Sequence, residues 1–154
     1  MRVANEMGDE PIFMAVPRND PEWQNTVLDA QRSLHVFRQL LRSECADDLY
    51  PNIKAVLDTG EDRAFIWLVV LEDLSTGFVT RDFELPPEFE VFQDQEIIVE
   101  DCDVKDWMVI QDGVLRGGYS VRYQRLKTPP SERAQFDARV GVTTYAKPDV
   151  PHDH

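Results

Sequence analysis

Six residues between positions 106 and 122 combine charge, aromatic rings and glycine in a pattern that could bind a ligand. They are Asp106, Trp107, Gly117, Gly118, Tyr119 and Arg122. A guanidinium and exposed glycine N–H groups both donate hydrogen bonds to anions, so these residues could bind an anion or a peptide terminus. They could instead be structural, with Asp106 and Arg122 forming an ion pair while Trp107 and Tyr119 pack the sheet. We favour the structural interpretation, because aromatic residues in hairpins usually serve packing.

The sequence just before this group is strongly acidic. Between positions 84 and 106 a single base, Lys105, opposes nine acids. These acids are Glu84, Glu88, Glu90, Asp94, Glu96, Glu100, Asp101, Asp103 and Asp106. Basic residues prevail from Asp112 to Lys147, so charge is segregated along the chain. Such a run is either a solvated face or a surface that docks a basic partner. The candidate residues of that surface, named the acidic docking edge below, are Glu96, Glu100, Asp101 and Asp103.

The sequence lacks the usual spacings of metal sites and activated nucleophiles. It contains no HExxH or CxxC motif, and its acids lack the alternation and central glycine of a calcium loop. Cys102 stands between Asp101 and Asp103, which disfavours a reactive thiolate. The glycine pair at 117–118 is not followed by the lysine and serine of a phosphate-binding loop. We therefore expect no catalytic residue, no metal and no cofactor, and we favour a protein that is not an enzyme.

Composition narrows the class of protein further. With 154 residues, 42% of them hydrophobic and 29% charged, the chain has the size and make-up of one globular domain. A net charge of −13 repels phosphate backbones, so nucleic acid is not an expected partner. The longest apolar run, 64–71, is too short to cross a membrane. The first residues do not resemble a signal peptide, so we expect a cytoplasmic protein in which Cys45 and Cys102 are free thiols.

The N-terminal half predicts a long amphipathic helix. Asp20 suits the capping position and Pro21 the first turn. Apolar residues then recur every three or four positions, which predicts one helix of about 25 residues lying on a core. The stripe consists of Trp23, Val27, Ala30, Leu34, Phe37, Leu41 and Cys45. The polar residues 1–10 are expected to form a flexible N-terminus, and residues 11–17 an edge strand or an extended segment.

From position 53 onward the pattern is that of strands. We expect strands over 53–57, 64–71, 78–83 and 97–99, then a hairpin of 107–111 and 114–125 around Asp112-Gly113. A short helix should follow Pro130, and residues 141–154 should form a mostly irregular tail. Short connections favour antiparallel pairing. The sequence thus predicts an α+β domain over 11–140, with the long helix packed on a mainly antiparallel sheet of about five strands.

Several of these segments together resemble the YegJ-like family, a bacterial domain of unknown function. The resemblance covers about residues 11–137. Its most specific features are Asp106-Trp107-Met108 and Gly117-Gly118-Tyr119 at this separation. The family is also distantly similar to domains among the immunity proteins of bacterial toxin systems, and a shared fold does not fix a function.

Three functions remain open at this point. The leading hypothesis is a non-enzymatic interaction domain that binds a basic protein through residues 84–106 and the adjoining hairpin. An immunity-type inhibitor of a basic toxin is its most specific form. The alternative is a small-ligand binding domain or an enzyme that uses the Trp107, Tyr119 and Arg122 end of the hairpin. An accessory subunit would instead expose an apolar patch on the long helix.

Overall fold

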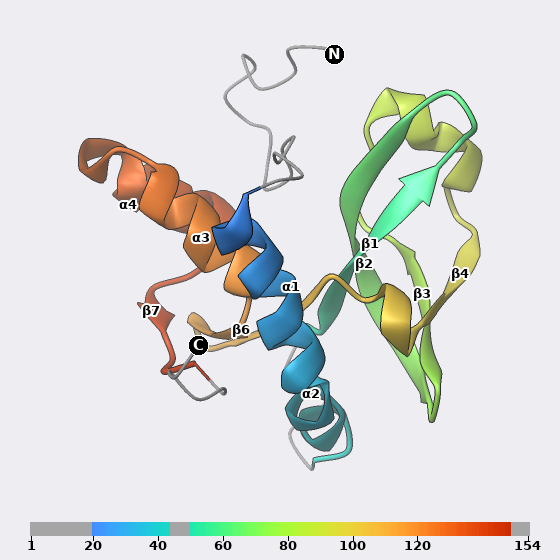
Figure 1. Cartoon of the computed structure of the whole chain (residues 1–154), viewed down its shortest axis with the longest axis horizontal. Coiled ribbons are helices and arrows are strands. Elements are labelled where there is room, and N and C mark those ends of the chain that lie inside the picture. Colours follow the sequence, from blue (N-terminus) through green and yellow to red (C-terminus); the bar gives the residue numbers. More distant parts are fainter. Residues whose placement is uncertain (1–19, 44–49, 149–154) are drawn as a thin grey trace.

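The computed structural model describes residues 20–43 and 50–148 (Figure 1). Its α-helices are α1 (Pro21–Arg32), α2 (Leu34–Leu41), α3 (Tyr119–Lys127) and α4 (Arg133–Val140). Its strands are β1 (Asn52–Asp58), β2 (Arg63–Leu74), β3 (Gly77–Asp82), β4 (Glu96–Glu100), β5 (Asp106–Gln111), β6 (Val114–Gly117) and β7 (Thr144–Tyr145). Short 3-10 helices are η3 (Pro87–Phe92), η4 (Asp101–Asp103) and η5 (Pro130–Glu132).

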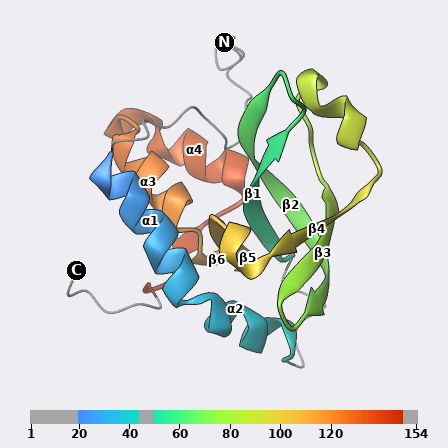
Figure 2. The ribbon, with the colours of Figure 1, turned by 45° about the vertical axis from the view of Figure 1, so that its right-hand side comes forward.

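All of these strands belong to one sheet, in the order β4-β3-β2-β1-β5-β6-β7. Every neighbouring pair is antiparallel except β6 and β7, which are parallel. The α+β class and the mainly antiparallel sheet are confirmed, whereas the expected number of about five strands is wrong, because the described residues already form a sheet of seven. One of the additional strands, β7, has only two residues, too few to show an alternating pattern in the sequence. Figure 2 shows the ribbon of β1–β4 on one side of the molecule and α3 and α4 on the other.

The predicted single long helix is wrong, because α1 and α2 are separate helices that meet at Ser33. Asp20 does cap α1, accepting a hydrogen bond from the N–H of Glu22. Ser33 is fully buried, and its hydroxyl donates to the carbonyl oxygen of Asp29 at 2.8 Å. A serine bonded to the preceding turn bends a helix. The same hydroxyl accepts a hydrogen bond from Nε1 of Trp107 at 3.0 Å, so the helix breaks where the core needs a polar partner.

The predicted strand over 114–125 is also wrong, because β6 ends at Gly117 and α3 begins at Tyr119. Gly117 and Gly118 have φ values of +71° and +63°, in the left-handed region that glycine adopts without strain. A β-carbon on Gly117 would lie 2.5 Å from the carbonyl oxygen of Trp107 and 2.6 Å from its ring. The glycine pair therefore turns the chain out of the sheet and into a helix.

Two clusters of buried side chains fill the space on the two faces of the sheet. Ile53 of β1 lies opposite Trp107 of β5, and both pack with Phe37 of α2 in the larger cluster. Side chains alternate between faces, so the neighbouring pair, Lys54 and Asp106, points to the other face. The apolar side chains there come from β2, β5, β6, α3, α4 and the segment after α4. They are Trp67, Met108, Leu115, Val121, Phe136 and Val142.

Several expectations concern residues that the structure does not describe. The ranges 1–10, 11–17 and 149–154, and Cys45 at the end of the apolar stripe, all lie outside the described residues. Within the described residues the stripe is buried at Ala30, Leu34 and Phe37. None of the described helices is long and apolar enough to cross a membrane.

We expect Gly117→Ala to lower the free energy of unfolding by about 1–3 kcal/mol more than Gly60→Ala, measured by urea denaturation. Both positions have positive φ, +71° and +96°, so both variants share the backbone strain of alanine there. Only at Gly117 does the new methyl group meet Trp107, since nothing lies within 4 Å of a β-carbon at Gly60. Equal losses in the two variants would contradict a requirement for close approach at Gly117.

Candidate functional site

Asp106 is completely buried, and its carboxylate holds the start of α3. Oδ1 accepts hydrogen bonds from the N–H groups of Trp107 at 2.8 Å and Tyr119 at 3.1 Å. Oδ2 accepts from the N–H of Ser120 at 2.8 Å and from its hydroxyl at 2.5 Å. Tyr119 and Ser120 open α3, and the first N–H groups of a helix have no partner within it. Asp106 therefore caps α3 from a strand that is distant in sequence.

Lys54 brings a positive charge to the same place. Its position on β1 is directly opposite Asp106 on one side and Trp67 on the other. The ammonium donates a hydrogen bond to Oγ of Ser120 at 2.8 Å and lies 5.0 Å from the centre of the Trp67 ring. Because Ser120 donates in turn to Asp106, its hydroxyl joins the two opposite charges. Lys54, Asp106 and Ser120 are named the buried polar cluster below.

Burial disfavours both charges of this cluster. It raises the pKa of Asp106, an effect opposed by the charge of Lys54 and by hydrogen bonds from Ser120 and Trp107. Burial also lowers the pKa of Lys54 to about 8, and the charge of Asp106 opposes this shift. Opposite charges taken out of water together gain little net stability, but removing either one leaves an uncompensated charge in the interior. The cluster thus fixes how α3 lies against β1 and β5.

The predicted ion pair between Asp106 and Arg122 is wrong. Arg122 lies one turn into α3, where its N–H donates to the carbonyl oxygen of Gly118 at 3.0 Å. Its Nε donates to the carbonyl oxygen of Gly117 at 2.8 Å, and its guanidinium lies 5.7 Å from the centre of the Tyr145 ring. The prediction placed Arg122 on a strand, and the turn into a helix at the glycine pair directs its side chain elsewhere.

The hairpin end is part of the interior. Trp107 has no exposed surface, and its ring stacks on Phe37 with centroids 5.3 Å apart and meets the edge of Tyr119 at 6.2 Å. The structure thus brings Asp106, Trp107, Tyr119 and the glycine pair together, in contacts that serve packing and capping. Two surface hollows, of about 490 and 330 Å³, lie elsewhere, beside α2 and beside η3. Neither is lined by any residue of the hairpin end.

β4, at one end of the sheet, and the following η4 carry the acidic docking edge. Glu96 and Glu100 are exposed, and Ile98 between them is 65% exposed. The three side chains share one face of the strand, because alternate residues of a strand point the same way. Asp103 of η4 is exposed as well. In the described part of the chain, no cation lies within ion-pair distance of Glu96, Glu100 or Asp103.

Asp101 differs from the other residues of the edge, because it anchors η4 to the helices. Its two carboxylate oxygens accept hydrogen bonds from Arg38 of α2 at 2.7 and 2.8 Å. Arg38 also donates to Asp73 at 2.8 Å, and these carboxylates raise the pKa of its guanidinium. Gln31 of α1 donates to the carbonyl oxygens of Asp101 at 2.9 Å and Val104 at 2.6 Å. The backbone that displays the exposed acids is therefore held in place by α1 and α2.

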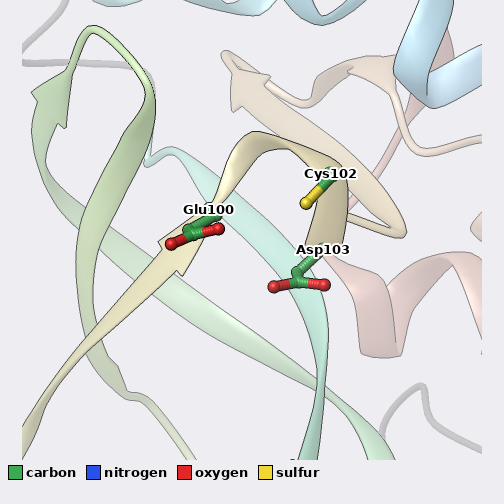
Figure 3. A group of neighbouring side chains, drawn as sticks. All are labelled: Glu100, Cys102 and Asp103. Carbon is green, nitrogen blue, oxygen red and sulfur yellow. The ribbon is translucent and has the colours of Figure 1, made fainter.

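Glu100, Cys102 and Asp103 gather at the turn from β4 into η4 (Figure 3). Their potential ligand atoms all lie within 4.8 Å of one another, and all three side chains are exposed. Carboxylates and thiolates do ligate divalent cations. Water solvates exposed groups of this kind, however, so their proximity alone does not define a metal site. Cys102 is a free cysteine.

Both the buried polar cluster and the acidic docking edge lie within the part of the chain that matches a known family. Residues 20–144 match a family model whose description reads "Uncharacterized protein conserved in bacteria (DUF2314)". The chain belongs to this family. The match confirms the expectation of an uncharacterised bacterial family, and the family's description names no activity. No curated protein and no solved structure gave a match to the chain.

The sequence did not reveal Lys54 and Ser120 as members of a cluster. In the strand over 53–57, Lys54 alternates with Ile53 and Ala55, a pattern that normally marks a solvent-facing position. The signal available for Ser120 was the glycine pair before it, which can end a strand as well as bulge it. Gln31 and Arg38 were equally hidden, because polar residues on a helix usually face water.

We expect Lys54→Met to lower the free energy of unfolding at pH 7 by about 3–5 kcal/mol, because the Asp106 carboxylate loses its counter-charge. The difference should then widen with pH. Lys54 has a pKa of about 8 in the folded protein and 10.5 in an ordinary lysine. Between these two pKa values the unfolded wild-type chain binds more protons than the folded protein does. The free energy of unfolding of wild type therefore rises with pH, by up to about 3 kcal/mol, and Lys54→Met lacks this gain.

Urea denaturation of both proteins from pH 7 to 10.5 measures this widening. Lys127→Met serves as the control, because Lys127 is exposed and pairs with Glu22 at the surface. Parallel curves for wild type and Lys54→Met above pH 8 would show that the buried ammonium does not titrate in this range.

Proposed function

We propose that this protein is a non-enzymatic interaction domain that binds a basic protein partner through the acidic docking edge. The observation that carries the proposal is the composition of residues 82–104, which include nine acids and no basic residue. Opposite charge accelerates association and selects the partner. The carboxylate of Asp101 is bonded to Arg38 and holds η4 in place. The residues that contact the partner are therefore Glu96, Glu100, Asp103 and their neighbours.

Exposed apolar side chains are concentrated in the same part of the chain. Phe83, Val91 and Ile98 are 72%, 61% and 65% exposed, and all three lie within residues 82–104. Only four other large hydrophobic residues in the described ranges are exposed, and they are scattered over the rest of the chain. Apolar side chains surrounded by charge are typical of protein interaction sites.

The most specific form of this function is an immunity-type inhibitor, whose partner is a basic toxin. It is supported by the charge of the surface, which is opposite to that of such a toxin. The proposed compartment is the cytoplasm, where the exposed thiol of Cys102 would stay reduced. Ligand binding at the hairpin end has less support, because Asp106 and Trp107 are completely buried.

We expect the triple variant Glu96→Gln, Glu100→Gln, Asp103→Asn to bind the partner roughly 10- to 100-fold more weakly than wild type, given typical energies of interface charges. The matched control is Glu61→Gln, Asp62→Asn, Glu132→Gln, which removes the same charge at exposed positions elsewhere. Wild type, triple variant and control are used as baits at low salt in a lysate of the source organism. A protein retained by wild type and control is identified, purified and titrated against all three baits.

The proposal requires that the purified protein be basic and that its affinity fall with added salt. If the triple variant and the control bind it equally well, the acidic docking edge is not the binding surface. If wild type retains no protein that the triple variant loses, the proposed function is wrong.

A further inference from the structure

The hydrogen bonds of β4 show which of its backbone groups face outward. The carbonyl oxygen of Ile97 accepts a hydrogen bond from the hydroxyl of Thr80 on β3 at 2.7 Å. The N–H of Asp101 donates to the carbonyl oxygen of Thr76, just before β3, at 3.0 Å. In an antiparallel pair, residues that direct both groups to the partner strand alternate with residues that direct both away. Glu96, Ile98 and Glu100 therefore direct their N–H and C=O groups away from β3.

These outward groups form an open edge of the sheet. No described residue forms a backbone hydrogen bond with the outer side of β4, which ends the strand order. Natural edge strands are often blocked by proline or a bulge, or carry charged side chains that deter pairing. β4 contains no proline, its register with β3 is continuous from Glu96 to Glu100, and both of its charged residues are acidic. The edge has the backbone geometry that another strand needs for pairing.

The charge of β4 distinguishes between two strands that could pair with it, one from a second copy of the chain and one from a basic partner. If a second copy of the chain paired through β4 about Ile98, Glu96 of one copy would lie opposite Glu100 of the other. Like charges directly opposite each other destabilise a pair of strands, so self-association is disfavoured. Basic residues at those two positions of a partner strand would instead form opposite-charge pairs.

Ile98 determines which kind of residue of a partner strand fits between the two basic residues. It lies opposite Val79 of β3, which is half-buried, and its own side chain is 65% exposed. An apolar residue opposite Ile98 on an added strand would extend this row of apolar side chains and remove Ile98 from water.

We propose that the acidic docking edge binds an extended segment of its partner as an additional antiparallel strand, with basic residues opposite Glu96 and Glu100 and an apolar residue opposite Ile98. The inference deepens the proposed function and rests on it. It adds that the backbone of β4, and not only the side-chain charge, holds the partner.

The probe is the synthetic peptide Ser-Lys-Thr-Val-Thr-Lys-Ser with blocked ends, whose lysines and valine match the three positions. In the antiparallel register the valine N–H faces β4, and the threonine N–H groups face solvent. A methyl group on the valine nitrogen should therefore weaken binding at least tenfold, and methyl groups on the threonine nitrogens should leave the affinity within about twofold. Titration of the folded protein, followed by NMR shifts of the Glu96, Ile98 and Glu100 amides, measures both.

Each outcome of this titration decides the proposal. Selective loss with the methylated valine supports strand addition. Equal binding of all three peptides, abolished by the triple variant of the acidic edge, overturns strand addition and leaves the charge-based proposed function intact. Failure of the unmethylated peptide to bind overturns the proposed pattern of basic and apolar residues, and the bait experiment above then judges the proposed function by itself.

A second test changes the protein instead of the peptide. Ile98→Pro removes an N–H that faces outward, and proline is tolerated on edge strands at such positions. Ile98→Ala is the matched control, because it shortens the same side chain and keeps the N–H. With both variants folded by circular dichroism, we expect Ile98→Pro to bind the peptide at least tenfold more weakly than Ile98→Ala. Equal affinities would contradict pairing at the outer side of β4.

Discussion

A carboxylate without contact with water must find all of its hydrogen bonds inside the protein, and Asp106 finds them at the start of α3. That requirement fixes several elements together. The glycine pair must turn the chain so that the N–H groups of Tyr119 and Ser120 reach Asp106. Lys54 must lie opposite Asp106 on the neighbouring strand, where its ammonium balances the charge of the carboxylate. The next residue, Trp107, is thereby directed to the opposite face, where its indole N–H meets Ser33 and the first helix breaks.

The sequence predicted those parts of the fold that depend on local signals, such as short apolar runs between turn residues and a capping residue before a helix. Strands β1 to β5 and the cap of α1 at Asp20 follow from such local patterns, and the structure contains them. The errors occur where a contact between distant segments overrides the local pattern. Ser33 ends α1 because Trp107 is its partner, and residues 119–125 form a helix because Asp106 caps them. In sequence, the alternation of Tyr119, Val121 and Tyr123 is indistinguishable from that of a strand.

The two groups of candidate residues differ in how far the sequence could reveal them. The excess of acids over bases between positions 84 and 106 is visible without any structure, because solvent exposure of charge is the common case. Which acids face outward was not predictable, since Asp101 becomes an anchor only through Arg38, which is far away in the sequence. The buried polar cluster was hidden for the opposite reason. Lys54 occupies a position typical of a surface lysine, and α3 covers it only in the folded chain.

The two ends of the sheet are unlike each other. One end is β7, only two residues long, which runs parallel to β6 and is followed by Ala146, whose N–H bonds to Leu115. The other is the longer, acidic β4. Edge-to-edge polymerisation needs two complementary edges on every molecule, so that each added copy presents a new site. β4 repels a second copy of itself, and β7 has only two residues to offer. In the described part of the chain, pairing of sheet edges between copies of the protein is therefore disfavoured, and with it the growth of a fibre by this mechanism.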